Sequence, residues 1–220
     1  MRRTYIPLAA AIFALCATSM HAATDPALDK ALRQIDAASA KFQSAEADLK
    51  WDLYEHVVRE TTTQTGSTYF LRTKTGTEMG AIITSPSLKY LHFADGKGSL
   101  YDAVAKKLTP FDAGQNRSRV ESFLTLGFGG SGKDLERAWN VTLQGTETID
   151  GTPTVKLDLT PKDPATADTF THVTVWVDTT RAISLKQEFF TPEHDTRTTY
   201  YTHVRYNTPV NVKKYAAPKH

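Results

Sequence analysis

Cysteine is almost absent from this chain of 220 residues, where Cys16 is the only one. A single thiol excludes a disulfide framework and any metal site built from several thiolates. The chain also lacks an excess of one charge, because 26 Lys+Arg oppose 24 Asp+Glu. Nucleic-acid binding normally needs a concentrated basic patch, so we expect no nucleic-acid partner.

A long hydrophobic run is missing at the N-terminus as well. The uncharged stretch 5–19 has 15 residues, short of the ~20 that span a bilayer. Arg2 and Arg3 precede it, and Ala22 and Ala23 follow, which predicts a secretory signal peptide over residues 1–22. Its removal leaves 24 Lys+Arg, 24 Asp+Glu and no cysteine. We expect an exported protein whose residues 23–220 form a single domain. Lipid attachment at Cys16 is the alternative.

Residues 25–42 have the pattern of one amphipathic helix. Asp25 is a capping residue before Pro26, and apolar side chains recur at helical spacing from Leu28 to Phe42. The period then changes to two, with Leu49, Trp51 and Leu53 on one side of a strand. Further strands are expected over 67–74, 78–85, 88–94, 99–108, 140–146, 154–160, 172–178, 184–191 and 198–206.

Short turns separate these strands, which indicates hairpins and an antiparallel sheet. The pattern is interrupted between Phe111 and Trp139, where Ser118 and Glu121 form a capping box and a second helix is expected to begin at Ser131. We expect mainly β structure with about ten or eleven strands and three helices. The tail 213–220 is expected to be frayed.

Motifs for catalysis are weak. The run Gly127–Asp134 matches a phosphate loop, but a helix is expected before it and Asp134 stands where a hydroxyl would bind magnesium. The histidines have no metal-ligand spacing, and the acidic residues alternate as on a solvated strand face. We therefore predict no enzyme, no cofactor and no metal.

Apolar side chains occupy both faces of several strands, including Phe70, Ile83 and Val175. A long antiparallel sheet of this kind must curl, and helices across its mouth would enclose either a packed core or a ligand cavity. Periodicity alone favours neither.

Several motifs together resemble the outer-membrane lipoprotein carrier (LolA) family, and the resemblance covers most of the chain after residue 22. They are the opening helix, Gly66–Arg72, Ala94–Lys97 with Leu100–Asp102, Phe123–Gly127 with Asp134-Leu135, Leu157–Lys162, Val175–Asp178 and the strand 200–206. The resemblance implies an incomplete antiparallel β-barrel covered by a lid of about three short helices. It also implies a monomeric carrier in the periplasm that shields acyl chains of lipoproteins or lipids in an apolar cavity.

The family resemblance assigns roles to particular residues. Arg72 is similar to the arginine that tethers the lid, although this chain lacks the family's proline there and Lys74 is a second match. The predicted lid and cavity residues are Phe70, Phe123, Leu124, Leu126, Phe128, Trp51, Ile83 and Val175. The predicted lid hinge consists of Gly127, Gly129, Gly130 and Gly132.

The implied partners are an inner-membrane lipoprotein-releasing ABC transporter and an outer-membrane lipoprotein acceptor. Two alternatives remain open from the sequence. The same fold could sense lipids or lipoproteins for a signalling partner, or it could support an enzyme with a polar pocket.

Overall fold

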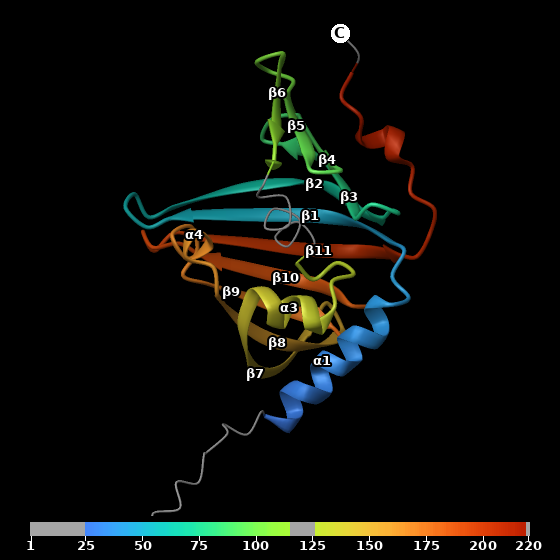
Figure 1. The fold of residues 1–220 in the computed structure, drawn as a ribbon. Helices are drawn as coiled ribbons and strands as arrows, with labels where there is room; N and C mark the ends of the chain where they lie inside the picture. The colour runs from blue at the N-terminus through green and yellow to red at the C-terminus, as the bar shows by residue number, and fades with distance from the viewer. Residues whose placement is uncertain (1–24, 115–125, 219–220) are drawn as a thin grey trace, which may run out of the picture.

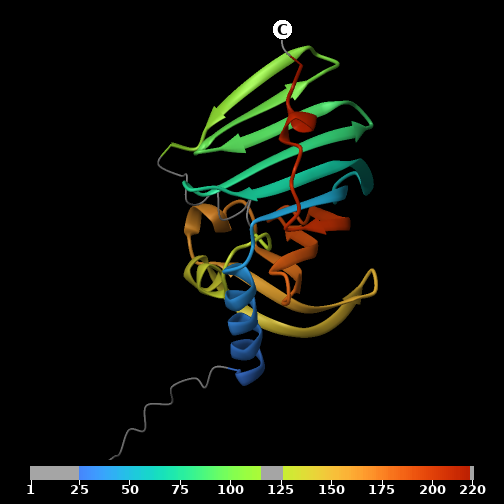
Figure 2. The same ribbon diagram turned by 90° about the vertical axis from the view of Figure 1, so that its right-hand side faces the viewer.

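One antiparallel sheet with eleven strands dominates the structure, a computed structural model that describes residues 25–114 and 126–218. The α-helices lie together on one side of this sheet (Figures 1 and 2). The elements are α1 (Pro26–Ser39), β1 (Ser44–Glu55), β2 (Glu60–Arg72), β3 (Thr77–Ser85), β4 (Lys89–Ala94), β5 (Lys97–Asp102), β6 (Lys107–Asp112), α3 (Gly132–Ala138), β7 (Trp139–Ile149), β8 (Thr152–Pro161), α4 (Pro164–Ala167), β9 (His172–Asp178), β10 (Ile183–Phe190), β11 (Thr196–Tyr206) and the 3₁₀ helix η2 (Val212–Tyr215).

The strand order is β6-β5-β4-β3-β2-β1-β11-β10-β9-β8-β7. Two runs of hairpins, β1 to β6 and β7 to β11, therefore join where β1 pairs with β11. Strands β6 and β7 lie at the two ends of the order and do not pair with each other, so the sheet curves without closing (Figures 1 and 2). The predicted fold class, an incomplete antiparallel barrel with a helical lid, is confirmed.

Both predicted helix starts in the described residues are confirmed. The Asp25 side chain accepts a hydrogen bond from the amide of Ala27 at 2.9 Å, and Pro26 opens α1. At α3, Ser131 and Asp134 form a reciprocal capping box. The helix expected around Ser118 lies outside the described residues.

The prediction of a single strand over 99–108 is wrong. A turn at residues 103–106 divides this segment into β5 and β6, and Asp102 accepts hydrogen bonds from the amides of Val104 and Ala105. The sequence Ala103–Lys106 contains no glycine or proline, so the usual turn signal is missing. Lys106 takes the left-handed conformation itself, with φ of 50°.

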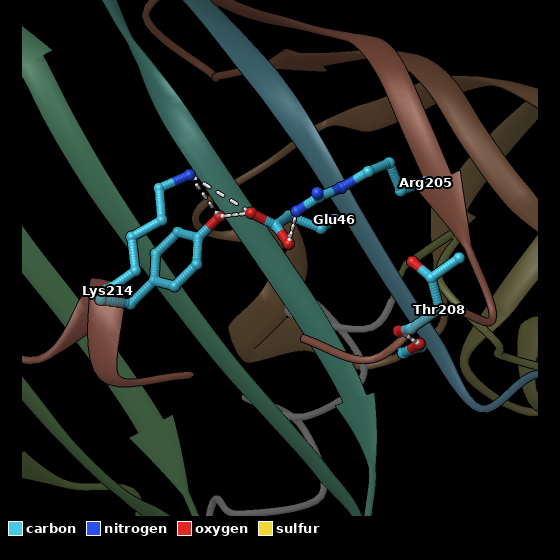
Figure 3. Close-up of polar contacts among 6 residues, drawn as sticks. Glu46, Arg205, Thr208 and Lys214 are labelled. Atoms are coloured by element: carbon cyan, nitrogen blue, oxygen red, sulfur yellow. Dashed lines mark hydrogen bonds and ion pairs between the residues drawn. The ribbon is translucent and has the colours of Figure 1, made fainter. Parts of the chain in front are cut away.

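The tail is not frayed over the described residues up to 218, contrary to expectation. Tyr215 is only 1% exposed, and its hydroxyl donates to Glu46 Oε1 at 2.7 Å. Glu46 also accepts from Lys214 Nζ at 3.2 Å and from Arg205 (Figure 3). The ring of Tyr215 lies 4.8 Å from that of Tyr69, so aromatic packing and hydrogen bonds together hold the tail on the sheet.

The buried apolar residues form two clusters. The first packs α1 and α3 against β7 to β9 and consists of Leu28, Leu32, Ile35, Ala38, Leu126, Leu135, Trp139, Leu157, Leu159, Val173, Val175, Val177 and Ala182. The second lies over the central strands and consists of Phe42, Ala45, Ala47, Phe70, Met79, Phe93, Ala113, Phe128, Ile183, Leu185 and Tyr201. The helices thus cover one half of the sheet, and the central strands retain space beside the second cluster.

Candidate functional site: an apolar cavity beneath a lid segment

A cavity of about 540 Å³ lies against the central strands. Its apolar lining consists of Leu49, Trp51, Phe70, Met79, Ala81, Ile83, Leu91, Leu100, Phe170, Phe189 and Tyr201. Its polar lining consists of Gln64, Thr68, Lys89, Gln187, Arg197 and Thr199. The volume lies in the range of small-molecule sites, and the apolar majority suits a hydrocarbon ligand.

Strand register explains why these side chains meet. Trp51 of β1 lies opposite Gln64 of β2 and Thr199 of β11, and Leu49 lies opposite Tyr201. Because residues two apart on a strand share a face, Leu49 and Trp51 point to the same side and the lysine between them points away. The period-two pattern of β1 therefore places its apolar side chains in the cavity.

Phe128 packs against two aromatic residues that line the cavity. Its ring stacks on that of Phe70 with centroids 3.9 Å apart and packs edge-on against Tyr201 at 4.7 Å. Burial raises the pKa of the Tyr201 phenol, which stays neutral and contacts Gln187 Oε1 at 3.4 Å. Gln187 in turn donates to the carbonyl of Leu126. Two polar contacts of Gln187 thus connect the ring of Tyr201 to the backbone of Leu126.

Residues 126–138, which we call the lid segment, cross from these aromatic residues to the start of β7. The amide of Gly129 donates to the carbonyl of Ala182 at 3.0 Å, and the amide of Ser184 donates to the carbonyl of Gly127. The carbonyl of Gly129 also accepts from Ser39 Oγ at 2.6 Å. The segment is therefore bonded to both α1 and the β9–β10 turn.

Arg72, at the end of β2, completes these contacts. Its Nη2 donates to the carbonyl of Gly129 at 2.6 Å and to Ser39 Oγ at 3.5 Å, and its guanidinium lies 5.8 Å from the ring of Phe42. Lys74 is exposed and makes no hydrogen bond or ion pair within residues 25–114 and 126–218. Of the two basic residues that the motif nominates, only Arg72 contacts the lid segment in the described structure.

Close packing constrains the glycines of the lid segment. Gly127 and Gly129 have φ of 78° and 75°, and a Cβ at Gly129 would lie 2.3 Å from Phe42 Cδ1. Both conformations favour glycine. Gly130 lies between them and α3, and Gly132 is the first residue of α3.

The predicted lid and cavity residues fall into three groups. Trp51, Phe70 and Ile83 line the cavity, and Phe128 packs on it. Leu126 and Val175 instead lie in the cluster beneath α1 and α3, so Val175 is a core residue and its placement on the cavity is corrected. Val175 of β9 pairs with Gln187 of β10, which lines the cavity. Val175 itself lies in the part of the sheet that α1 and α3 cover. Phe123 and Leu124 lie outside the described residues.

Sequence reasoning missed the polar members of the cavity, Arg197 above all. The sequence does contain a signal for Arg197. This residue precedes Thr199 by two residues and Tyr201 by four, so all three side chains lie on one face of β11. Within residues 25–114 and 126–218, no group of three or more His, Cys, Asp or Glu could hold a metal ion. Over the same residues, no helix is both long and apolar enough to span a bilayer.

Solved structures with the same arrangement include the MucB subunit of the Pseudomonas aeruginosa MucA/MucB complex and the Mycobacterium tuberculosis lipoprotein LppX. MucB gives a TM-score of 0.54 at 13% identity, over 87% of this chain and 61% of that one. LppX gives 0.50 at 16% identity, over 86% of this chain and all of that one. A LolA superfamily protein from Nitrosomonas europaea gives 0.41 at 12% identity, over 86% and 97% of the two chains.

Identities this low show the fold alone, and this chain spans about three fifths of MucB. The open antiparallel sheet and the likenesses to MucB and LppX show that this chain shares its fold with those two proteins. A family described only as an uncharacterized protein matches residues 129–216. No curated protein matches the sequence significantly.

Proposed function

We propose that this protein is a periplasmic carrier that binds acyl chains of lipoproteins or lipids in its apolar cavity and moves them from the inner to the outer membrane. The observation that carries the proposal is the cavity of about 540 Å³ against the central strands, whose lining includes Phe70 and Tyr201. Its lining is mostly hydrocarbon and aromatic, which matches an acyl chain better than a polar substrate. The role is binding without catalysis.

Exposure of acyl chains to water has a large free-energy cost. Each methylene kept from water contributes about 0.8 kcal/mol, so a multiply acylated lipoprotein has a high barrier to crossing an aqueous compartment. A cavity that covers the chains lowers this barrier.

In this proposal the lid segment must move when cargo enters. Arg72 acts as the lid tether, because its bond to the Gly129 carbonyl joins β2 to the segment in the closed state. Gly127, Gly129, Gly130 and Gly132 supply the hinge, since a chain with several glycines has access to more backbone conformations. Leu126 and Phe128 move with the segment.

The carrier would act in the periplasm after residues 1–22 are removed as a signal peptide, with residues 23–220 as one domain. An inner-membrane ATP-dependent transporter would load it, and an outer-membrane lipoprotein would receive the cargo. The carrier would work as a monomer.

Two measurements test this function. Mass spectrometry of lipid extracts from the natively purified protein should find acylated species, and the protein should release lipoproteins from liposomes that contain the transporter. Ala81→Phe should abolish both activities, because Ala81 lines the cavity and is 4% exposed, so a ring there fills the space. Absence of acylated species and of release with the unsubstituted chain would contradict the proposal.

A second candidate is an envelope module of the same fold that senses lipids or lipoproteins without moving them. The similarity to MucB favours it, because that protein was solved in complex with MucA. A pull-down from envelope fractions discriminates the two. Recovery of a membrane signalling protein supports the sensor, and recovery of an ATP-dependent transporter supports the carrier.

A further inference from the structure

The charged residues of the cavity all have one sign. Among its described lining residues only Lys89 and Arg197 are charged, and no Asp or Glu is among them. A site for neutral hydrocarbon alone gains nothing from the half-buried cations in its lining, because partly removing a charge from water is costly unless it is paired. The lining therefore indicates a ligand with an acidic group.

Only one of the two cations lacks a partner. Lys89 Nζ lies 4.0 Å from Asp102 Oδ2. Arg197 makes no ion pair or hydrogen bond with any described residue, and its Nε is buried without a hydrogen-bond partner. Buried polar atoms are nearly always hydrogen-bonded in native proteins, so an unpaired guanidinium Nε on a residue that lines an apolar cavity needs an explanation.

The position of Arg197 fits the mouth of an elongated site. On β11, Arg197, Thr199 and Tyr201 share the cavity face, and exposure falls from the half-buried Arg197 to Thr199 and Tyr201, both 8% exposed. Four strand residues correspond to about 13 Å. Phe170 holds the guanidinium from the side, 5.7 Å from its ring centroid.

We propose that Arg197 binds the acidic headgroup of an amphiphile whose alkyl chain fills the cavity. The guanidinium Nε and one Nη can donate together to the two oxygens of a carboxylate or phosphate. The headgroup then lies at Arg197, and the chain runs past Trp51 toward Leu49 and Tyr201. This assignment rests on the proposed function and narrows its ligand to lipids with a free acid.

The test uses the delipidated full chain without residues 1–22 and three probes with the same oleoyl chain. Oleate carries a carboxylate, oleoyl lysophosphatidic acid carries a phosphate, and methyl oleate carries no charge. The unsubstituted chain should bind at least one acid about tenfold more tightly than methyl oleate, as a charge-assisted hydrogen bond requires. Whichever acid binds more tightly identifies the headgroup chemistry, and either supports the proposal.

Three variants assign the effect to one residue. Arg197→Leu should remove the preference for the acid while methyl oleate binds as before, which also reports that the cavity is folded. Arg197→Lys should retain part of the preference. Lys89→Met, at the other cation of the lining, should retain most of it.

Each contrary result has a separate meaning. Equal binding of acids and methyl oleate, or an unchanged preference in Arg197→Leu, overturns the role of Arg197 and leaves the apolar cavity intact. Loss of the preference in Lys89→Met alone places the anion at Lys89 and overturns the assignment. Absence of binding by all three probes overturns the proposed function and this inference with it.

Discussion

Nη2 of Arg72 donates a hydrogen bond to the carbonyl oxygen of Gly129 at 2.6 Å. The same oxygen accepts from Ser39 Oγ, also at 2.6 Å, so the end of β2 and the end of α1 meet at one point of the lid segment. A single side-chain substitution can therefore weaken the attachment of the segment without removing any buried apolar group.

Arg72→Leu should speed the exchange of a bound fluorescent fatty acid severalfold. Loss of the bond to the Gly129 carbonyl favours movement of the lid segment, while the Ser39 bond remains. Because the Arg72 side chain is exposed, the free energy of unfolding should fall by only about 1 kcal/mol. Stopped-flow fluorescence measures the exchange rate, and urea unfolding measures the stability.

The matched control for Arg72 is Lys74→Leu, which removes a nearby cation that makes no hydrogen bond or ion pair with a described residue. It should leave both exchange and stability unchanged. An effect of Lys74→Leu without an effect of Arg72→Leu would contradict the assignment and identify Lys74 as the lid tether.

Phe128→Ala should lower the free energy of unfolding by about 3 to 5 kcal/mol. Phe128 is 1% exposed and packs against both Phe70 and Tyr201, so its truncation leaves a hole beside these two rings. Phe111→Ala, at a ring that is 40% exposed on β6, should cost much less. Similar costs for the two variants in urea unfolding would contradict this account of the aromatic packing.

Gly129→Ala should destabilise the protein more than Gly151→Ala. The two glycines have nearly the same φ, 75° and 74°, so alanine should cost about 1 kcal/mol at either through the backbone. Only at Gly129 would the new Cβ meet a neighbour, Phe42, whereas nothing lies within 4 Å at Gly151. Equal thermal midpoints would show that Phe42 moves aside without cost.

Glu46 should make folding stability depend on pH through the C-terminal tail. Burial acts to raise the pKa of this carboxyl, but hydrogen bonds from Tyr215, Lys214 and Arg205, with the charge of Arg205, hold the pKa below 4.5. The carboxylate therefore stabilises the fold above about pH 4.5, and that contribution is lost as the pH falls through the lower folded-state pKa. Urea unfolding from pH 3 to 7 measures it.

Glu46→Gln is the variant that isolates this effect. It should cost about 2 kcal/mol at pH 7 and flatten the acid-side slope, since the amide cannot carry the charge that its donors stabilise. Tyr215→Phe keeps the ring against Tyr69 and removes one donor, so its cost should be smaller. An unchanged slope in Glu46→Gln would contradict the assignment.

Local signals were enough to predict most of the fold. Asp25-Pro26 and the Ser131/Asp134 box mark helix starts through contacts within three residues, and period two marks the strands. The turn at 103–106 and the ordered tail could not be predicted in this way. Lys106 adopts a left-handed conformation without being glycine, and Tyr215 is held by Glu46, 169 residues earlier in the chain.

The site residues that could be predicted are those whose position follows from the alternation of side chains between the two faces of a strand. Trp51, Phe70 and Ile83 line the cavity because their faces follow from alternation. Val175 points to the same face of the sheet as the cavity residues, but it lies where α1 covers that face. The position of α1 depends on helix packing across the fold and could not be predicted from the strand pattern. Arg197 was missed because an arginine in a strand is usually solvated, and only the three-dimensional packing leaves its Nε without a partner.

The most direct test of the carrier account is photocrosslinking of the natively folded protein with a photoreactive fatty acid, followed by peptide mapping. The account predicts crosslinks on peptides that carry Trp51, Phe70 and Ile83, and their loss in Ala81→Phe. Crosslinks confined to the exposed Val57 and Phe111, or crosslinks that persist in Ala81→Phe, would contradict the account.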